Sequence, residues 1–246
     1  MTDAIILSDL HLGSDNCRAR ELRQFLEVIR RGDTPTRRLI LNGDVFDSID
    51  FRRLKKQHWK VLSLIRKLSD DVETVWVHGN HDGEFEFISH LLGVNVVEEY
   101  QFRSGGKTIL CRHGHQSDEF ISRYRFTTWF ADFAYRWLQR LDKTHTFARY
   151  AKRQSKIFIR STETIERGAI VRARQVGADV VCCGHTHLAA AKPDGPIEYY
   201  NSGCWTESPS HFLTVHGGVI ELNEANAFSI EEDADYESVL SLSASA

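Results

Sequence analysis

The sequence predicts a layered α/β fold with mixed strand pairing, in which polar motifs gather at the carboxyl ends of strands. Three observations predict it. Short apolar runs alternate with helical patterns, polar motifs directly follow most of these runs, and a hairpin and terminal strand patterns break the alternation. Such alternation is typical of a sheet covered by helices, where ligands bind beyond the carboxyl ends of the strands.

Buried strands are expected where apolar residues run together, at 5–7, 39–41, 75–77, 109–111 and 180–183. Their continuous apolar character favours strands that are covered on both faces. Helices are expected over Glu21–Ile29 and His58–Leu68, where apolar residues recur at helical spacing. In the first helix one apolar stripe is formed by Leu22, Phe25, Leu26 and Ile29.

Antiparallel pairing is predicted at two places. Tyr100–Phe102 and Thr108–Cys111 flank Ser104-Gly105-Gly106, a pattern typical of a hairpin with a glycine turn. Further strands are expected near the end of the chain, at 197–201, 212–215 and 219–222. Parallel and antiparallel pairs should therefore occur together.

The chain divides into a core and one insertion. Residues 1–116 and 176–232 are expected to form the core, because a chain of 246 residues can bury a sizeable one. Residues 117–175 have a helical pattern without proline and are expected to form an inserted helical subdomain. The tail, 233–246, lacks the apolar content to pack and is expected to be disordered.

Composition is that of an ordinary globular chain, with 26% charged residues and a formal net charge of −3. Met1 leads directly into a strand pattern, and no apolar stretch approaches the ~18 residues of a membrane span, so a cytoplasmic protein is expected. An acidic chain without a long basic groove is not expected to bind nucleic acid. The odd number of cysteines, five, has no regular spacing, and those in apolar runs are expected to behave as small hydrophobes.

Positive charge is concentrated between Ser117 and Arg174. This segment has 13 Lys/Arg against 6 Asp/Glu, a balance of +7, so the remainder of the chain carries −10. Such a segment can attract an anionic ligand or the inner face of a membrane, although a solvated helix face gives the same pattern. Peripheral membrane contact is therefore retained as an expectation.

The polar motifs carry the chemistry. They are Asp9-x-His11, Gly43-Asp44-x-x-Asp47, Gly79-Asn80-His81-Asp82, His113-Gly114-His115 and Gly184-His185-x-His187, with Asn201-Ser202-Gly203 following. Carboxylate, imidazole and carboxamide groups are ligands that divalent manganese, iron, zinc and cobalt accept. Each residue alone has an ordinary explanation, such as a helix cap or a turn. Five such motifs in order along one chain favour a metal site.

A site with two metals needs a bridging carboxylate and separate ligands on each side. Asp9 and His11, two residues apart at a strand end, can point at one ion. Asp44, which follows a glycine after its own strand, is the natural bridge, and Asn80 offers a neutral oxygen to the second ion.

The histidines of the last two motifs have different expected roles. His185 and His187 flank one residue, and in extended backbone their side chains would share a face, so that each can serve a different ion. His115 has two interpretations. It either lies behind the metal ligands and supports them, or it is a loop residue without a role in the site.

With these motifs the chain resembles the calcineurin-like metallophosphoesterase superfamily. The pattern Asp-x-His, Gly-Asp-x-x-Asp, Gly-Asn-His-Asp/Glu, His and Gly-His-x-His is complete between Asp9 and His187. The resemblance implies a four-layer αββα sandwich of two mixed sheets flanked by helices. It implies that one divalent ion is held by Asp9, His11, Asp44 and His187, and the other by Asp44, Asn80, His113 and His185.

The resemblance also implies a reaction, the hydrolysis of a phosphoester by direct attack of a metal-bridging hydroxide on phosphorus. Asn80 and His81 would lie beside the substrate phosphate, and His81 would stabilise the transition state or protonate the leaving oxygen. A protonated His81 would be supported by Asp82 or by Asp47. Manganese is the metal expected first, while iron, zinc and cobalt accept the same ligands.

Two motifs are similar to a narrower branch, the one that contains UDP-2,3-diacylglucosamine hydrolase. They are Ser8-Asp9-Leu10-His11-Leu12-Gly13 and Gly43-Asp44-Val45-Phe46-Asp47. That branch cleaves the pyrophosphate of a UDP-linked diacyl sugar in lipid A synthesis and carries a helical lid where residues 117–175 lie. The aromatic and basic residues of this segment suit a ligand with an apolar end and a diphosphate. Contacts with such a substrate are expected from Asp118, Lys152 and Lys156.

Departures from that branch leave a second substrate class open. The branch typically has arginine where this chain has His81, and a small residue followed by proline where this chain has Leu188 and Ala189. The alternative is a general phosphodiesterase or phosphatase that acts on soluble nucleotides or other phosphoesters. A non-catalytic scaffold is disfavoured, because no ligand of the motif set is missing.

Overall fold

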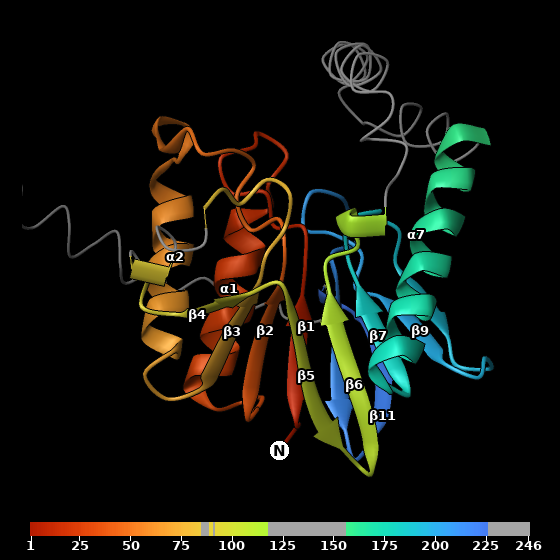
Figure 1. Cartoon of the computed structure of the whole chain (residues 1–246). Coiled ribbons are helices and arrows are strands. Elements are labelled where there is room, and N and C mark those ends of the chain that lie inside the picture. Colours follow the sequence, from red (N-terminus) through yellow and green to blue (C-terminus); the bar gives the residue numbers. More distant parts are fainter. Residues whose placement is uncertain (85–88, 91, 118–155, 226–246) are drawn as a thin grey trace, which may run out of the picture.

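The computed structural model describes residues 1–84, 89–90, 92–117 and 156–225. In this part of the chain two sheets pack face to face and helices cover their outer faces (Figure 1). The predicted α/β sandwich of two mixed sheets is therefore confirmed.

The first sheet has six strands in the order β11-β10-β1-β2-β3-β4. Their bounds are β1 Ala4–Leu7, β2 Arg38–Asn42, β3 Glu73–Val77, β4 Asn95–Val97, β10 His211–His216 and β11 Val219–Glu224. Strands β1 to β4 run parallel, whereas β10 pairs antiparallel with both β1 and β11. Strand β4 was not predicted, because it is three residues long and not fully buried.

The second sheet has five strands in the order β5-β6-β7-β9-β8. Their bounds are β5 Glu99–Ser104, β6 Lys107–Arg112, β7 Val180–Cys183, β8 Ala190–Lys192 and β9 Glu198–Asn201. Strands β5 and β6 form the predicted antiparallel hairpin, and β7 lies parallel between β6 and β9. The short edge strand β8 was not predicted, because its three residues are partly or fully exposed.

The helical elements with described bounds are three longer helices and two short 3-10 turns. They are α1 Ala19–Arg31, α2 Lys56–Leu68, α7 Lys156–Val176, η1 Phe51–Arg53 and η2 His115–Ser117. Both predicted helices are confirmed and are slightly longer than expected. Helix α1 ends at Gly32, which adopts a left-handed φ of 83° and donates its N–H to the carbonyls of Val28 and Ile29.

The core of the described residues has three apolar clusters. One lies between α1, α2 and the first sheet, one between the two sheets, and one between the second sheet and α7. Ala4 and Ile6 of β1 face the second sheet, whereas Ile5 and Leu7 face α1 and α2. The second sheet packs against α7 on its outer face, with Ala173 in the contact. Each central strand is therefore buried on both faces, which is why the strands appear in the sequence as continuous apolar runs.

Parts of the predicted insertion and tail lie outside the described residues, which exclude 118–155 and 226–246. The contacts predicted for Asp118, Lys152 and the side chain of Lys156 also lie outside them, so the division into core, insertion and tail stays a prediction. Among the described residues, no helix is long and apolar enough to cross a membrane.

Candidate metal centre

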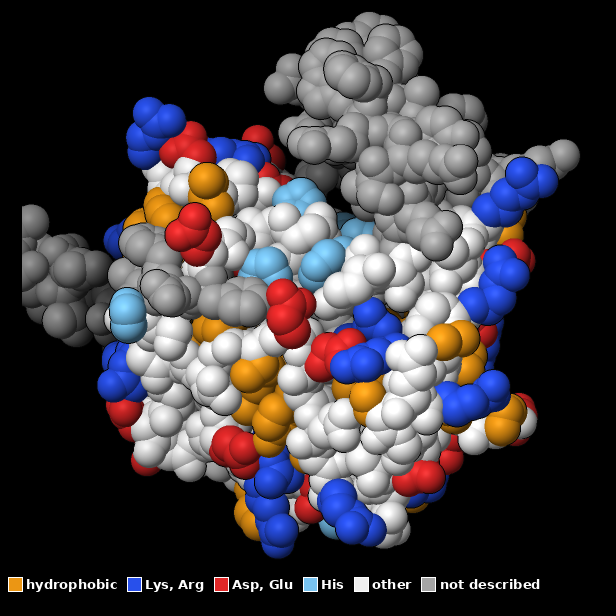
Figure 2. All heavy atoms as spheres, viewed as in Figure 1, with side chains coloured by type: hydrophobic (Ala, Val, Ile, Leu, Met, Phe, Trp, Pro, Cys, Tyr) orange, Lys and Arg blue, Asp and Glu red, His pale blue; other side chains and the backbone are white. Residues whose placement is uncertain are grey.

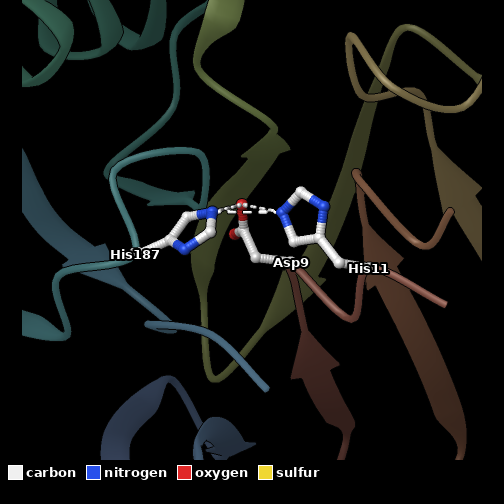
Figure 3. Close-up of side chains that lie close together, drawn as sticks. All are labelled: Asp9, His11 and His187. Atoms are coloured by element: carbon white, nitrogen blue, oxygen red, sulfur yellow. Dashed lines mark hydrogen bonds and ion pairs between the residues drawn. The ribbon is translucent and has the colours of Figure 1, made fainter. Parts of the chain in front are cut away.

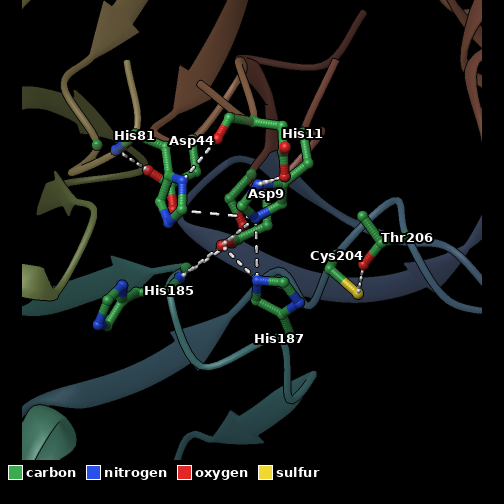
Figure 4. Close-up of polar contacts among 12 residues, drawn as sticks. Asp9, His11, Asp44, His81, His185, His187, Cys204 and Thr206 are labelled. Carbon is green, nitrogen blue, oxygen red and sulfur yellow. Dashed lines mark hydrogen bonds and ion pairs between the residues drawn. The ribbon is translucent and has the colours of Figure 1, made fainter. Parts of the chain in front are cut away.

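Predicted ligands from both sheets converge at one edge of the sandwich, among them Asp9, Asp44 and His187 (Figure 4). Asp9 and His11 follow β1, Asp44 follows β2, Asn80 and His81 follow β3, His113 follows β6, and His185 and His187 follow β7. The strands of each set are parallel neighbours, so their carboxyl ends lie together. Figure 2 shows histidine side chains gathered on one face of the molecule.

The first cluster contains Asp9, His11 and His187 (Figure 3), whose ligand atoms lie within 4.8 Å of one another. Oδ1 of Asp9 is 3.3 Å from Nε2 of His187 and 3.9 Å from Nε2 of His11. The two imidazole nitrogens are 3.1 Å apart. Asp9 is fully buried. Two nitrogens and a carboxylate oxygen therefore point at one small volume.

The second cluster contains Asp44, His113 and His185, within the same 4.8 Å limit. Nε2 of His113 lies 3.2 Å from Oδ2 of Asp44. Nδ1 of His113 is 2.9 Å from the carbonyl oxygen of Asn42. Because a carbonyl can only accept, Nδ1 carries the hydrogen, and in the neutral ring Nε2 offers its lone pair toward Asp44, as in metal-ligating histidines.

Asp44 connects the two clusters. The oxygen that faces His113, Oδ2, also lies 3.9 Å from Nε2 of His11 in the first cluster. Its other oxygen, Oδ1, accepts the backbone N–H of His81 at 2.9 Å. One carboxylate thus faces ligands of both clusters, which is the position that a bridging ligand requires.

Five of the predicted metal ligands have backbone dihedral angles in the left-handed region. Among the described residues, the non-glycine residues with positive φ are Asp9 at 54°, His11 at 47°, Asp44 at 52°, His185 at 67° and His187 at 60°. Each such residue costs on the order of 1 kcal/mol, and strain of this kind gathers at functional sites. The expectation of extended backbone around His185 and His187 was wrong. Both residues have left-handed backbones, and each lies in a different cluster.

Glycines beside the ligands allow segments from different strands to approach closely. A Cβ on Gly79 would lie 2.2 Å from the backbone nitrogen and Oδ1 of Asp44, and one on Gly184 would lie 2.5 Å from Oδ2 of Asp9. Atoms cannot approach so closely without displacement, so a side chain at either position would push a carboxylate out of place. Glycine is therefore required at the first position of these two motifs, because no larger residue fits beside the carboxylates.

Asp82 joins the second and third motifs rather than supporting His81. Its buried carboxylate accepts four N–H groups, from the backbones of Asp44, Phe46 and Gly79 and from the indole of Trp76, at 2.9–3.0 Å. Burial and the nearby Asp44 raise the pKa of Asp82. The suggestion that Asp82 supports a protonated His81 is thus corrected, because its oxygens hold the backbone that presents Asp44.

His81 is exposed at the mouth of the site, with its ring centroid 5.1 Å from that of His11. Nδ1 of His81 is 2.8 Å from the backbone carbonyl of Asp47, to which it donates. Asp47 therefore positions His81 through its main chain, while its carboxylate lies 3.7 Å from Nδ1 of His11. Asn80 is exposed on the same turn, and its role as a ligand stays a prediction.

Asn201, which had no predicted role, holds the loop that carries the last two histidines. Its side chain is fully buried, and its Nδ2 donates to the carbonyl of Gly184 at 2.7 Å and to Oγ1 of Thr186 at 3.2 Å. Its Oδ1 accepts the N–H of Gly203 at 3.0 Å. The motif Asn-Ser-Gly was visible in the sequence, but only the strand order places it beside this loop.

Cys204 lies near His187 (Figure 4) and was also without a predicted role. Its thiol is buried and accepts a hydrogen bond from the Thr206 hydroxyl at 3.4 Å. Burial raises the pKa of the thiol, but His187 and the hydroxyl of Thr206 together lower the pKa by more, so the net shift is downward. Cys204 therefore adds a polarisable group next to a predicted ligand.

The carboxylates of the two clusters favour a positive charge beside them. Burial disfavours protonation of His113, but Asp44, Asp9 and the carbonyl of Asn42 together outweigh burial and raise the pKa of His113 to about 9. Burial likewise disfavours protonation of His187, but Asp9 and Cys204 together outweigh burial and raise the pKa of His187 to about 10. In the metal-free protein a proton thus compensates each carboxylate. A divalent cation can replace that proton, so the residues present fit two such ions.

The family model described as calcineurin-like phosphoesterase matches residues 4–189, from β1 to just beyond His187. This range includes all the predicted metal ligands and covers well over half of the chain. No curated protein matches the chain significantly.

Several solved structures are similar to the chain over most of its length. YfcE, a phosphoesterase from E. coli, is 16% identical, with 92% of this chain and 95% of that chain covered and a TM-score of 0.51. An archaeal phosphodiesterase is 14% identical, with coverages of 90% and 98% and a TM-score of 0.49. Vps29 complexed with zinc, from Entamoeba histolytica, is 15% identical, with coverages of 91% and 99% and a TM-score of 0.46. At such identity the likeness to YfcE shows a shared fold alone.

Proposed function

Because the chain belongs to the calcineurin-like phosphoesterase family, we propose that it hydrolyses phosphoesters with a pair of divalent metal ions. One observation carries the proposal. Oδ2 of Asp44 lies 3.2 Å from His113 and 3.9 Å from His11, so a single oxygen faces both ligand clusters. Proteins of this family are generally metal-dependent phosphoesterases with a dinuclear site, and this geometry suits such a site.

Each ion is assigned the ligands of one cluster, with Asp44 shared between them. One ion would be held by Asp9, His11, Asp44 and His187, and the other by Asp44, Asn80, His113 and His185. When bound, two divalent ions supply an activated water and withdraw charge from the phosphoryl oxygens. Manganese is our proposed metal, although iron, zinc and cobalt accept the same ligand types and availability decides among them.

The proposed catalytic residue is His81. Its Nδ1 is occupied by the carbonyl of Asp47, so Nε2 is the nitrogen left to meet a substrate at the mouth of the site. In the protonated ring Nε2 also carries a hydrogen, so it can donate to a phosphoryl oxygen or protonate the leaving oxygen. Asp47 acts as a positioning residue, because its carbonyl determines which nitrogen of the ring is available.

For the substrate we propose a nucleotide-diphosphate glycolipid that resembles UDP-2,3-diacylglucosamine, cleaved at its pyrophosphate. The support is the similarity of residues 8–13 and 43–47 to that branch, together with the positive charge and aromatic content of the segment from Ser117 to Arg174. In this proposal 117–175 contributes a helical lid over the substrate, which Asp118, Lys152 and Lys156 contact, while its last helix, α7, also packs on the second sheet. Soluble nucleotides and other phosphoesters are the alternative, favoured by His81 in place of arginine.

The experiment is hydrolysis of UDP-2,3-diacylglucosamine in detergent micelles with Mn²⁺, with the products identified by mass spectrometry. Bis-(p-nitrophenyl) phosphate is assayed in parallel as a test of the metal centre. Release of UMP and the lipid monophosphate supports the glycolipid substrate. Cleavage of the artificial diester alone supports phosphoester chemistry and removes that substrate, and no cleavage of either contradicts the proposed function.

A further inference from the structure

A third group of metal-ligating side chains lies beside the two clusters and shares no residue with them. It contains His78, Glu98 and His115, and one ligand atom of each lies within 4.8 Å of the others. His78 follows β3, Glu98 lies between β4 and β5, and His115 begins η2. The group is therefore assembled from three separate segments of the chain.

The strand register brings His78 and Glu98 together. Val77 of β3 is paired with Val97 of β4, so the next residues of these parallel strands lie side by side. The backbone N–H of His78 donates to the carbonyl of Val97 at 2.8 Å, which continues the pairing to the end of the strand. The proximity of the two side chains thus follows from the sheet.

The tautomer of His78 suits metal binding. Its Nε2 lies 2.7 Å from the backbone carbonyl of Gly83. Because a carbonyl cannot donate, Nε2 carries the hydrogen, and in the neutral ring Nδ1 carries the lone pair. Metal-ligating histidines are commonly held in this way, with the second nitrogen donating to a carbonyl.

His115 offers a second nitrogen. Its Nδ1 is buried and makes no hydrogen bond with any described residue. The ring centroids of His115 and His78 are 6.0 Å apart at an interplanar angle of 74°. A buried nitrogen without a partner is costly unless another group satisfies it, and a cation would do so.

Glu98 completes the group with a carboxylate. Its Oε2 lies 3.4 Å from Nε2 of Gln116, whose Oε1 accepts the N–H of Gly114 at 3.2 Å. Within the described ranges no lysine or arginine forms an ion pair with Glu98, whereas the adjacent Glu99 pairs with Arg172 at 2.9 Å. The charge of Glu98 is thus available to a cation.

We propose that His78, Glu98 and His115 bind a third divalent cation, with zinc preferred. Two histidines and one glutamate form a ligand set that zinc uses in proteins, with a further position left to water. Donors around tetrahedral zinc are separated by about 3.4 Å. The side chain of Glu98 is exposed and can rotate to close this distance. The ring centroid of His115 is 5.6 Å from that of His113. A cation bound to His115 would therefore restrict the motion of a residue that packs against the second cluster.

Zinc stoichiometry tests this inference independently of the proposed function. Chelator-stripped protein is titrated with Zn²⁺, freed of unbound metal by gel filtration and analysed by mass spectrometry of the elements. Wild type is expected to hold about three zinc ions per chain and Glu98→Gln about two. The matched control is Glu221→Gln, which removes an exposed carboxylate on β11 and should still hold about three. A wild-type value near two, or an unchanged value in Glu98→Gln, overturns the site.

A second variant separates the third site from the metal pair. Asp9→Ala combined with Asp44→Ala removes carboxylates from both clusters and should leave about one zinc ion per chain. Adding His115→Ala to this background should remove that ion, with circular dichroism used to verify the fold of each variant. No zinc in the double variant overturns the third site while leaving the phosphoesterase proposal to its own assay. Zinc that persists after His115→Ala overturns it as well.

Discussion

The candidate metal centre and the third cluster use the same kinds of side chain but are built differently. In the centre, Asp9 and Asp44 are buried and have left-handed backbones, with φ of 54° and 52°. In the third cluster Glu98 is exposed, and no member is among the residues with positive φ. The ligands of the centre are oriented by strained, left-handed backbone. In the third cluster, His78 and Glu98 are brought together by the regular pairing of β3 and β4.

Because of this difference, the two sites depend on neighbouring residues to different degrees. The ligands of the centre are held by other residues, since Asp82 binds the backbone of Asp44 and Asn201 binds the loop of His185. Loss of such a support should disturb the centre even if every ligand remains. The third cluster rests on strand pairing and on Gln116, so its loss should leave the centre assembled.

The largest expected effect would come from Asp44→Ala. Both ions would lose a shared ligand, so hydrolysis of bis-(p-nitrophenyl) phosphate should fall by on the order of 10³-fold or more. The measurement is kcat/KM together with bound metal. The control Asp194→Ala removes an exposed aspartate in the turn after β8 and should behave as wild type. Retained activity in Asp44→Ala would end the two-metal interpretation, and with it the contrast between the two regions.

The next effect concerns His81→Ala. We expect the rate to fall by roughly 10²–10⁴, the usual loss when a general acid or an electrostatic donor is removed. Bound metal should not change, because His81 touches Asp44 only through its backbone N–H. The control is His90→Ala, at another exposed histidine. An unchanged rate would show that His81 does not act on the substrate.

A smaller effect, on stability, is expected for Asp82→Asn. The amide nitrogen cannot accept the N–H groups that now surround the carboxylate, so the free energy of unfolding should decrease by about 2–4 kcal/mol. Urea denaturation measures this change. Asp70→Asn is the matched control, because Asp70 forms an exposed ion pair with Arg66 and should contribute little. Equal stability of the two variants would mean that Asp82 does not hold the centre together.

The smallest expected effect is a pH dependence of the metal-free protein. The pKa of His113 is raised from 6.5 to about 9 on folding, because Asp44, Asp9 and the carbonyl of Asn42 together outweigh burial. A raised folded pKa contributes stability that is complete below about pH 6.5 and is lost as pH rises through about 9. The melting temperature measured with a chelator should therefore fall between these two pH values. Bound metal replaces the proton, so this fall should diminish in loaded protein, and an equal fall in both forms would contradict the assignment of His113 as a ligand.

Much of the fold was predictable because its signals are local. The strand around Ile5–Leu7 is a continuous apolar run that is buried on both faces, and the hairpin of β5 and β6 turns at adjacent glycines. Strands β4 and β8 were missed, since three partly exposed residues leave no pattern. Their pairing depends on neighbouring strands that are distant in the sequence.

The sequence by itself determined which residues can bind metal and that they follow strand ends, because each ligand is attached to its own strand by one or two residues. Only the tertiary structure decided how they divide, with His187 beside Asp9 and His185 beside Asp44. It also decided the role of Asp82. The same holds for the cluster of His78, Glu98 and His115, in which strand pairing brings His78 beside Glu98 and η2 adds His115. The physical reason is that local patterns depend on neighbours along the chain, whereas distances between segments depend on sheet order and register.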